Sequence, residues 1–567
     1  MKIERNAEMT TRDGVTLRAD IYRPEAGGPY PSLLVRTPYG KEAYEGDPSY
    51  DFDRFVGAGY IVICQDVRGR HSSDGHWESF MQPDAPDAAD GYEAVEWAAR
   101  LPGASGRVGT FGASYDGFVQ WRTATARPPS LGAMSAQSIP ARYPDLEGPG
   151  TIRPGKRLHW WITKMAAEYR RRSGRAGTQL RSEGEAAWDA GEGVNWLHFL
   201  PWLDLPSEAF EDDTDAIQAW LRAPHTDPWQ LDRGMSQITV PNLDFTGWFD
   251  HAGGDMGTFK ALRRDGGSAT ARDRSRIVIG PWSHAGYNQS NFGAVDFGPA
   301  GLLDGVGLMI RWFDYWLKGA ANAIDADPRV KLFVMGDNAW RGEDEWPPVR
   351  ARDLEWFTTS HGHANTPAGD GELVRVRPAA GTADHYVYDP RNPVPDLYAP
   401  GRISIPTDQR PLAKRQDILV YQSPPVAERI EVTGNPSLEL TASSSAPDTD
   451  FFARLIDVSP DGLARDVSTG LVRTRYRDGV DRPSLVPPGT TVTYRIPMSA
   501  TSNAFLPGHR IRLDITSSCF PSYDRNHNTA ADQNADPELR QAAQTVFHGG
   551  NQATRLILPW IPNDPDR

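Results

Sequence analysis

Hydrophobic runs and helical patterns alternate along the first 145 residues of the chain. Five runs have the length and β-branched content of strands, at 7–11, 15–22, 32–36, 60–66 and 106–111. Asp13-Gly14 separates the first two runs and predicts a hairpin turn between them. A helix is predicted over 88–99, with apolar positions at Ala94 and Ala98. Because strands that alternate with helices build parallel sheets covered on both faces, this region predicts an α/β fold.

The strand pattern returns at 238–246 and 277–280, after a segment of different character. That segment lacks strand signals and is rich in Arg, Glu, Ala and Trp, which indicates a helical cap inserted into the α/β core. From about residue 345, short β-rich runs alternate with Pro and Gly, as is typical of a β-sandwich. The run 451–458 alternates imperfectly, which predicts a strand buried on both faces. We therefore predict an α/β core at 1–145 and 236–344, a cap at 146–235 and a sandwich at 345–567.

Composition narrows the class of protein. A chain of 567 residues is too long for one hydrophobic core. Hydrophobic residues make up 39% and charged residues 24%, as in ordinary globular proteins. The net charge of −14 argues against nucleic-acid binding, and the basic cluster at 170–172 is explained by a solvated helix face. No apolar run is long enough for a membrane span, and the charged N-terminus does not resemble a signal peptide.

The cysteines and histidines do not have the spacing of a metal site. Cys64 and Cys519 are the only cysteines, and they stand far apart in apolar contexts, so a disulfide is not expected and the cytoplasm is the predicted compartment. His361 and His363 lack the neighbouring ligands of a zinc site. There is no glycine-rich phosphate loop either, so we expect neither a metal nor a cofactor.

Ser114 is the strongest candidate for chemistry. It stands between glycines, after a predicted strand and before a helix-like run. A serine hydroxyl is a weak nucleophile until a base removes its proton, and it must project from a sharp turn to meet that base. Gly112 and Gly117 provide room for such a turn. The spacing is G-x-S-x-x-G, because Asp116 stands where the second glycine of the commoner G-x-S-x-G falls. A serine that only caps a helix would also fit.

Two further candidates follow in the order nucleophile, acid, histidine that α/β-hydrolases share. Asp250 comes just after the apolar run 240–249, and His284 comes after the strand-like run 276–280. Open parallel sheets place their chemistry at the carboxyl ends of strands. Taken singly, Asp250 could cap a helix and His284 could be a loop histidine. Their order and positions together predict a catalytic triad with Ser114.

Several segments also resemble the cocaine esterase / NonD family of hydrolases, whose relatives include X-prolyl dipeptidyl peptidases and α-amino-acid ester hydrolases. In that family the turn around the nucleophile reads G-x-S-Y-x-G, which matches the unusual spacing here. The similarity covers nearly the whole chain and is weakest at 146–235. The matching segments are 36–41, 66–69, 112–117, 247–250, 280–284, 311–319, 518–521 and 525–529.

This resemblance implies an α/β-hydrolase core with a helical cap and a C-terminal jelly roll. It also implies roles: Ser114 is the nucleophile, Asp250 the acid and His284 the base. The family's oxyanion hole falls on the Tyr115 N–H and on the Tyr39 hydroxyl. Preset donors of this kind stabilise the negative charge of a tetrahedral intermediate. Without the resemblance, Tyr39 would be interpreted as a buried tyrosine bonded to backbone.

Aromatic residues gather in the predicted cap. Large aromatic side chains form protein cores as often as they line apolar pockets, so we expect some of these to contact substrate and some to form the core of the cap. The candidates are Trp160, Trp161, Trp196, Phe199 and Trp202.

The function that these observations favour is hydrolysis of small-molecule carboxylic esters through an acyl-enzyme. An acylase, an α-amino-acid ester hydrolase, an X-prolyl dipeptidyl peptidase or an acyltransferase would use the same triad. Substrates with a free α-amine need carboxylates, and Asp116 is either such a group or an acidic residue placed by the helix dipole. A non-enzymatic alternative is a carbohydrate-binding sandwich beside a vestigial triad. A homodimer is compatible with the sequence.

Overall fold

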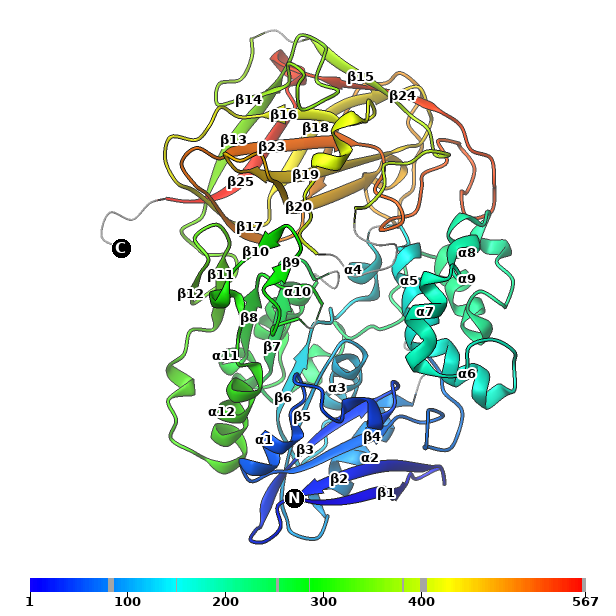
Figure 1. Ribbon diagram of the computed structural model, residues 1–567, viewed down its shortest axis with the longest axis vertical. Helices are drawn as coiled ribbons and strands as arrows, with labels where there is room; N and C mark the ends of the chain where they lie inside the picture. The colour runs from blue at the N-terminus through cyan, green and yellow to red at the C-terminus, as the bar shows by residue number, and fades with distance from the viewer. Residues whose placement is uncertain are drawn as a thin grey trace.

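The computed structural model describes residues 1–79, 86–148, 150–250, 254–284, 286–379, 382–397 and 405–562. Figure 1 shows a β-rich part at one end, an α/β part at the other end, and a group of helices beside them. The α/β-hydrolase core, the helical insertion and the C-terminal β-sandwich of the predicted fold class are confirmed.

The α/β core is built on parallel strands that the chain leaves after β6 and rejoins at β7. The first six strands lie in the order β1-β2-β4-β3-β5-β6, and a second group lies in the order β12-β11-β8-β7. A parallel bridge between Met134 and Asn242 joins the two groups. β1 and β2 form the predicted antiparallel hairpin. The bounds are β1 Lys2–Thr10, β2 Thr16–Arg23, β3 Tyr30–Thr37, β4 Ile61–Asp66, β5 Ala104–Ala113, β6 Leu131–Gln137, β7 Leu243–Gly247, β8 Arg276–Gly280, β11 Val330–Val334 and β12 Ala339–Glu343.

β7 is shorter than the predicted strand at 238–246. Residues 235–237 form a 3₁₀ turn, and the strand begins at Leu243. Pro241 has no N–H to donate to a ladder. The side chain of Asn242 instead accepts a hydrogen bond from the N–H of Ala136 at 2.8 Å, which ties the returning chain to β6.

Helices cover both faces of the core sheet. Leu34 in β3 belongs to the buried cluster that contains Ala94 of α2, whereas Leu33 belongs to the cluster that contains Phe313 of α12. Successive side chains of a strand point to opposite faces, so both faces of β3 are buried and its sequence is continuously apolar. The helices of this part are α1 Phe52–Gly57, α2 Asp87–Ala99, α3 Tyr115–Thr125, α10 Asp255–Asp265, α11 Ala269–Arg274 and α12 Gly305–Lys318.

Between β6 and β7 the described residues form short helices and turns joined by loops, with no strand among them, as the absence of strand signals predicts. In Figure 1 most of these helices stand to one side of the core and reach up to the β-rich part. Their bounds are α4 Tyr143–Glu147, α5 Pro154–Trp160, a π-helical turn Trp161–Met165, α6 Ala166–Ser173, α7 Gly184–Asp189, α8 Val194–His198 and α9 Thr214–Arg222, with 3₁₀ turns η3 Arg181–Glu183, η4 Trp202–Asp204 and η5 Glu211–Asp213.

The C-terminal part is a β-sandwich whose buried cluster of aliphatic and aromatic residues continues into β8 and β11 of the core. β19 is buried along nearly its whole length, which confirms the prediction for 451–458. The strands are β13 Arg352–Thr359, β14 Glu372–Val374, β15 Ala383–Tyr388, β16 Leu419–Gln422, β17 Ile430–Gly434, β18 Ser437–Ser444, β19 Asp450–Val458, β20 Ala464–Arg473, β21 Val492–Pro497, β22 Thr501–Phe505, β23 Arg510–Thr516, β24 Ala542–Phe547 and β25 Arg555–Ile561. Among the described helices, none is long and apolar enough to cross a membrane.

Candidate active site

Ser114 lies at a strained turn between β5 and α3. Its backbone angles are φ 61° and ψ −123°, a region that residues other than glycine rarely adopt. The turn is crowded: a Cβ atom at Gly112 would lie 2.6 Å from Cβ of Asp116, and one at Gly117 would lie 2.8 Å from the carbonyl oxygen of Gln137. The two glycines are therefore required by close approach, and the turn presents Ser114 at the carboxyl end of β5.

Asp250 and His284 are held together by two loops that stay paired beyond their strands. The N–H of Trp248 donates to the carbonyl of Gly280, and the N–H of Phe249 donates to the carbonyl of Trp282. Asp250 is buried, and its Oδ1 lies 2.9 Å from Nδ1 of His284. With Nδ1–H donated to the carboxylate, Nε2 is the basic nitrogen of the imidazole.

One cavity of about 220 Å³ brings the predicted site together. Ser114, His284, Tyr39 and Tyr115 all line it. Much of the remaining wall is apolar and comes from α3, the chain after β6, and the cap: Phe118, Ile139, Leu146, Trp160 and Trp229. A concave, mainly apolar site with a few polar groups is the usual form of a small-molecule pocket.

The two predicted oxyanion donors both border this cavity. Burial raises the pKa of Tyr39 to about 12, and nearby Asp116 adds to the rise, so the hydroxyl keeps its proton at neutral pH. The Ser114 hydroxyl and the indole of Trp160 are hydrogen-bond partners of Tyr39. Tyr115 is the first residue of α3, where backbone N–H groups have no acceptor within the helix.

Asp116 is buried behind the nucleophile in an environment that the sequence does not reveal. The hydroxyls of Tyr44 and Tyr50 both donate to its Oδ2. Oδ1 has no hydrogen-bond partner among the described residues. Burial raises the pKa of Asp116 to about 7. A carboxyl group held by two tyrosines is not explained by the helix dipole alone. Tyr44, Tyr50 and the cap residue Arg181 also line the cavity, and no local sequence motif predicts this.

Only Trp160 of the five candidate aromatic residues lines the cavity. Trp161 is fully buried and donates its indole N–H to Glu211. Trp196 packs against Phe199, with ring centroids 6.1 Å apart, and Trp202 packs against Phe210. These four residues pack within the cap in this structure, as was expected of some of the five, and their contact with substrate stays a prediction.

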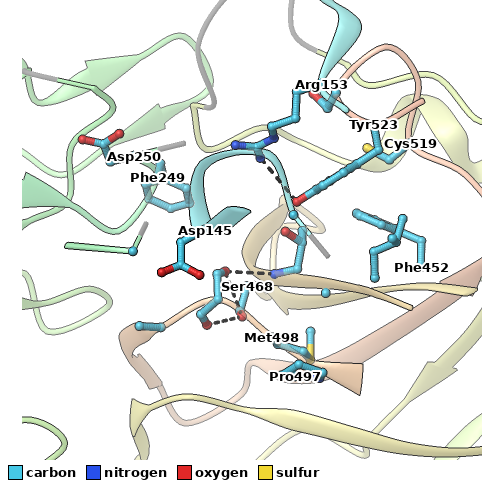
Figure 2. Close-up of a pocket in the computed structure, with 18 of the residues that line it drawn as sticks. Asp145, Arg153, Phe249, Asp250, Phe452, Ser468, Pro497, Met498, Cys519 and Tyr523 are labelled. Atoms are coloured by element: carbon cyan, nitrogen blue, oxygen red, sulfur yellow. Dashed lines mark hydrogen bonds between the residues drawn. The ribbon is translucent and has the colours of Figure 1, made fainter. Parts of the chain in front are cut away.

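A larger cavity of about 550 Å³ lies between the core and the sandwich. Figure 2 shows Asp145, Phe249 and Asp250 on one side of it, with Phe452 and Tyr523 across from them. Asp250 borders this cavity, but Ser114 and His284 are not among the described residues that line it. Size alone does not identify an active site, and the smaller cavity is the candidate because it contains the serine and the histidine.

Comparison with known proteins matches the two ends of the chain to the two domains of X-Pro dipeptidyl-peptidases. The family of X-Pro dipeptidyl-peptidases (S15 family) matches residues 13–286, and the X-Pro dipeptidyl-peptidase C-terminal non-catalytic domain matches residues 322–557. The sequence is 34% identical to the cocaine esterase of Rhodococcus sp. (strain MB1 Bresler) in an alignment 587 residues long, gaps included, which covers 98% of each chain.

Two solved structures are similar over nearly the whole chain. An aminopeptidase from a marine sediment archaeon, Thaumarchaeota archaeon, has a TM-score of 0.81 at 26% identity, covering 99% of this chain and 97% of that one. An α-amino acid ester hydrolase shares the fold, with a TM-score of 0.78 at 24% identity over 99% and 96% of the two chains. The extent of the match to the esterase, together with both domains, shows that the chain belongs to the cocaine esterase / NonD family of α/β-hydrolase serine esterases.

Proposed function

We propose that this enzyme cleaves carboxylic esters of small molecules through an acyl-enzyme on Ser114. The observation that carries the proposal is the arrangement around one cavity: a serine on a strained turn, and a histidine whose Nδ1 lies 2.9 Å from a buried aspartate. The mainly apolar wall suits an uncharged acyl group.

In the first half of the reaction, Oγ of Ser114 bonds to the ester carbonyl carbon while Nε2 of His284 takes its proton. The carbonyl π electrons move to the oxygen, where the Tyr115 N–H and the Tyr39 hydroxyl stabilise the charge. The C–O bond to the alcohol then breaks, and His284 returns the proton to the leaving alcohol. Asp250 holds the imidazole in the required tautomer and stabilises its cation.

In the second half, water repeats these steps on the acyl-enzyme. His284 takes a proton from the water, the hydroxyl oxygen bonds to the acyl carbon, and the bond to Oγ of Ser114 breaks. The proton returns to Oγ, and the carboxylic acid leaves. Substrate specificity, the amount of acyl transfer to other nucleophiles and the choice between ester and amide all depend on what the cavity admits.

Labelling with a fluorophosphonate probe tests the nucleophile. The wild type is expected to be labelled and to hydrolyse p-nitrophenyl acetate and butyrate, whereas Ser114→Ala should be unlabelled and lose about three or more orders of magnitude in kcat. Equal labelling of the two proteins, or no turnover of either ester by the wild type, would reject the proposal.

Cleavage of substrates with a free α-amine is a second candidate, because Asp116 provides a carboxyl group at the cavity wall. Its Oδ2 already accepts from two tyrosines, and its raised pKa leaves it about half protonated near neutrality. We therefore place simple esters first. A higher kcat/KM for an alanine ester than for the matching propionate ester would reverse this order.

A further inference from the structure

The cap supplies two side chains that contact Tyr39 directly. Trp160 stands at the end of α5, and its indole N–H donates to the Tyr39 hydroxyl oxygen at 3.1 Å. Arg181 begins the 3₁₀ turn η3, and its guanidinium carbon lies 5.3 Å from the centroid of the Tyr39 ring. Nη1 of Arg181 also donates to the main-chain oxygen of Tyr39. Both residues come from the insertion, whereas Tyr39 follows strand β3 of the core.

These contacts affect how the Tyr39 hydroxyl can act. A tyrosine hydroxyl has one proton to donate and oxygen lone pairs that accept. Trp160 occupies the accepting side, which leaves the proton to be donated elsewhere. Burial has the largest effect on the pKa of Tyr39 and raises it, whereas the Trp160 N–H, the positive charge of Arg181 and the Ser114 hydroxyl each lower it. The hydroxyl therefore stays protonated but is polarised towards donation.

The loop that carries Tyr39 is clamped between core and cap. On the core side, the N–H of Lys41 donates to Asp66 at 2.9 Å. Arg70 follows β4 of the core and links this loop to the cap. Its buried side chain donates from Nε to the carbonyl of Pro38 at 3.0 Å and from Nη2 to the carbonyl of Met165 in the cap at 3.3 Å. The position of the Tyr39 main chain thus depends on the cap being in place.

We propose that the cap completes the oxyanion hole, with Trp160 and Arg181 as positioning residues that hold and polarise the Tyr39 hydroxyl. This inference rests on the proposed function, because it requires Tyr39 to donate to the carbonyl oxygen of the substrate. As Oγ of Ser114 bonds to the carbonyl carbon, the π electrons move to the oxygen, and the hydrogen bond from Tyr39 strengthens. The Trp160 N–H partly compensates the electron density that Tyr39 gains.

A mutant cycle between Trp160 and Tyr39 tests this coupling. Trp160→Phe keeps an aromatic ring, although a smaller one, and removes the N–H, so it is expected to lower kcat for p-nitrophenyl butyrate about tenfold, with a smaller change in KM. Tyr39→Phe alone should lower kcat about a hundredfold or more. In the Tyr39→Phe background the further change Trp160→Phe should have little effect on kcat, because the group it acts through is gone.

Trp220→Phe is the matched control. Trp220 lies in α9 of the cap, is buried, and has no acceptor for its indole N–H among the described residues. The same substitution there removes no hydrogen bond, so kcat should stay at the wild-type value. Thermal melts of all variants separate loss of fold from loss of catalysis.

Arg181 gives a second, independent measurement. Arg181→Met should lower kcat severalfold in the wild type and much less in Tyr39→Phe. Arg181→Lys should lower kcat less than Arg181→Met does, because lysine keeps the positive charge. A loss from Trp160→Phe that is equal in both backgrounds, or equal to the effect of Trp220→Phe, would overturn the inference. A fully active Tyr39→Phe would also overturn the inference, whereas labelling of Ser114→Ala would reject the proposed function itself.

Discussion

At the scale of single residues, the carboxyl group of Asp116 is the most unusual group near the nucleophile. It is 1% exposed, and burial raises its pKa to about 7 from an ordinary value near 4. Around neutral pH the folded protein therefore holds a proton that the unfolded chain releases. The contribution of Asp116 to stability is complete below about pH 4 and is lost as the pH rises through about 7.

This linkage predicts a pH-dependent effect of Asp116→Asn. The amide stays neutral at every pH and can still accept hydrogen bonds from Tyr44 and Tyr50. The difference in Tm between variant and wild type should move in favour of the variant as the pH rises from about 4 to about 7, and it should level off above that. Other buried carboxyl groups are the same in both proteins, so the difference isolates Asp116. A constant difference in Tm across this range would contradict the raised pKa.

At the scale of secondary-structure elements, the packing of α2 on α3 depends on a close approach at Gly91. A methyl group at Gly91 would lie 1.8 Å from Oγ1 of Thr123 and 2.8 Å from its Cβ. Alanine usually stabilises a helix interior by about 1 kcal/mol relative to glycine. Here the contact between the two helices should outweigh that preference, because neither helix can move without disturbing the sheet beneath them.

Gly91→Ala is therefore expected to lower the free energy of unfolding by about 1–3 kcal/mol. The control is Gly257→Ala in α10, where a methyl group would meet no described heavy atom within 4 Å. That change should raise the free energy of unfolding by up to about 1 kcal/mol. Chemical denaturation of both variants measures the difference, and the prediction is wrong if Gly91→Ala is as stable as Gly257→Ala.

At the scale of the whole molecule, the sandwich holds the beginning of the cap. Arg473 in β20 is buried, and its Nη2 lies 2.9 Å from Asp450 and 3.1 Å from Asp524. Its Nη1 donates to the carbonyl of Gly150, and the N–H of Asp524 donates to the carbonyl of Ile152. These bonds fix the chain just before α5, the helix that carries Trp160.

Arg473→Met should destabilise the protein by about 3–5 kcal/mol, because the buried carboxylate of Asp450 and the partly buried carboxylate of Asp524 lose their counter-charge. Loss of esterase activity should accompany the lower Tm, since the start of the cap is no longer held. Arg540→Met removes an exposed pair with Glu538 and serves as the control, with an expected change below about 1 kcal/mol. Equal melting temperatures for the two variants would show that the buried cluster does not support the fold.

The sequence by itself determined the features that depend on neighbouring residues. The turn at Ser114 needs glycines two residues before it and three residues after it, so a short sequence motif is enough to predict its geometry. Continuous apolar runs predicted strands buried on both faces, and the lack of strand signals predicted the helical cap. The order of Ser114, Asp250 and His284, each just after a strand, was enough to predict that they belong together.

Only the tertiary structure decided which distant side chains meet. Trp160 and Trp161 are adjacent in the sequence, yet one borders the cavity and the other is buried against Glu211. Arg181 reaches Tyr39 across 142 positions of the chain. Local patterns cannot encode such contacts, because they follow from how the cap docks on the core. That docking results from the packing of many side chains and is specified by no short segment of the sequence.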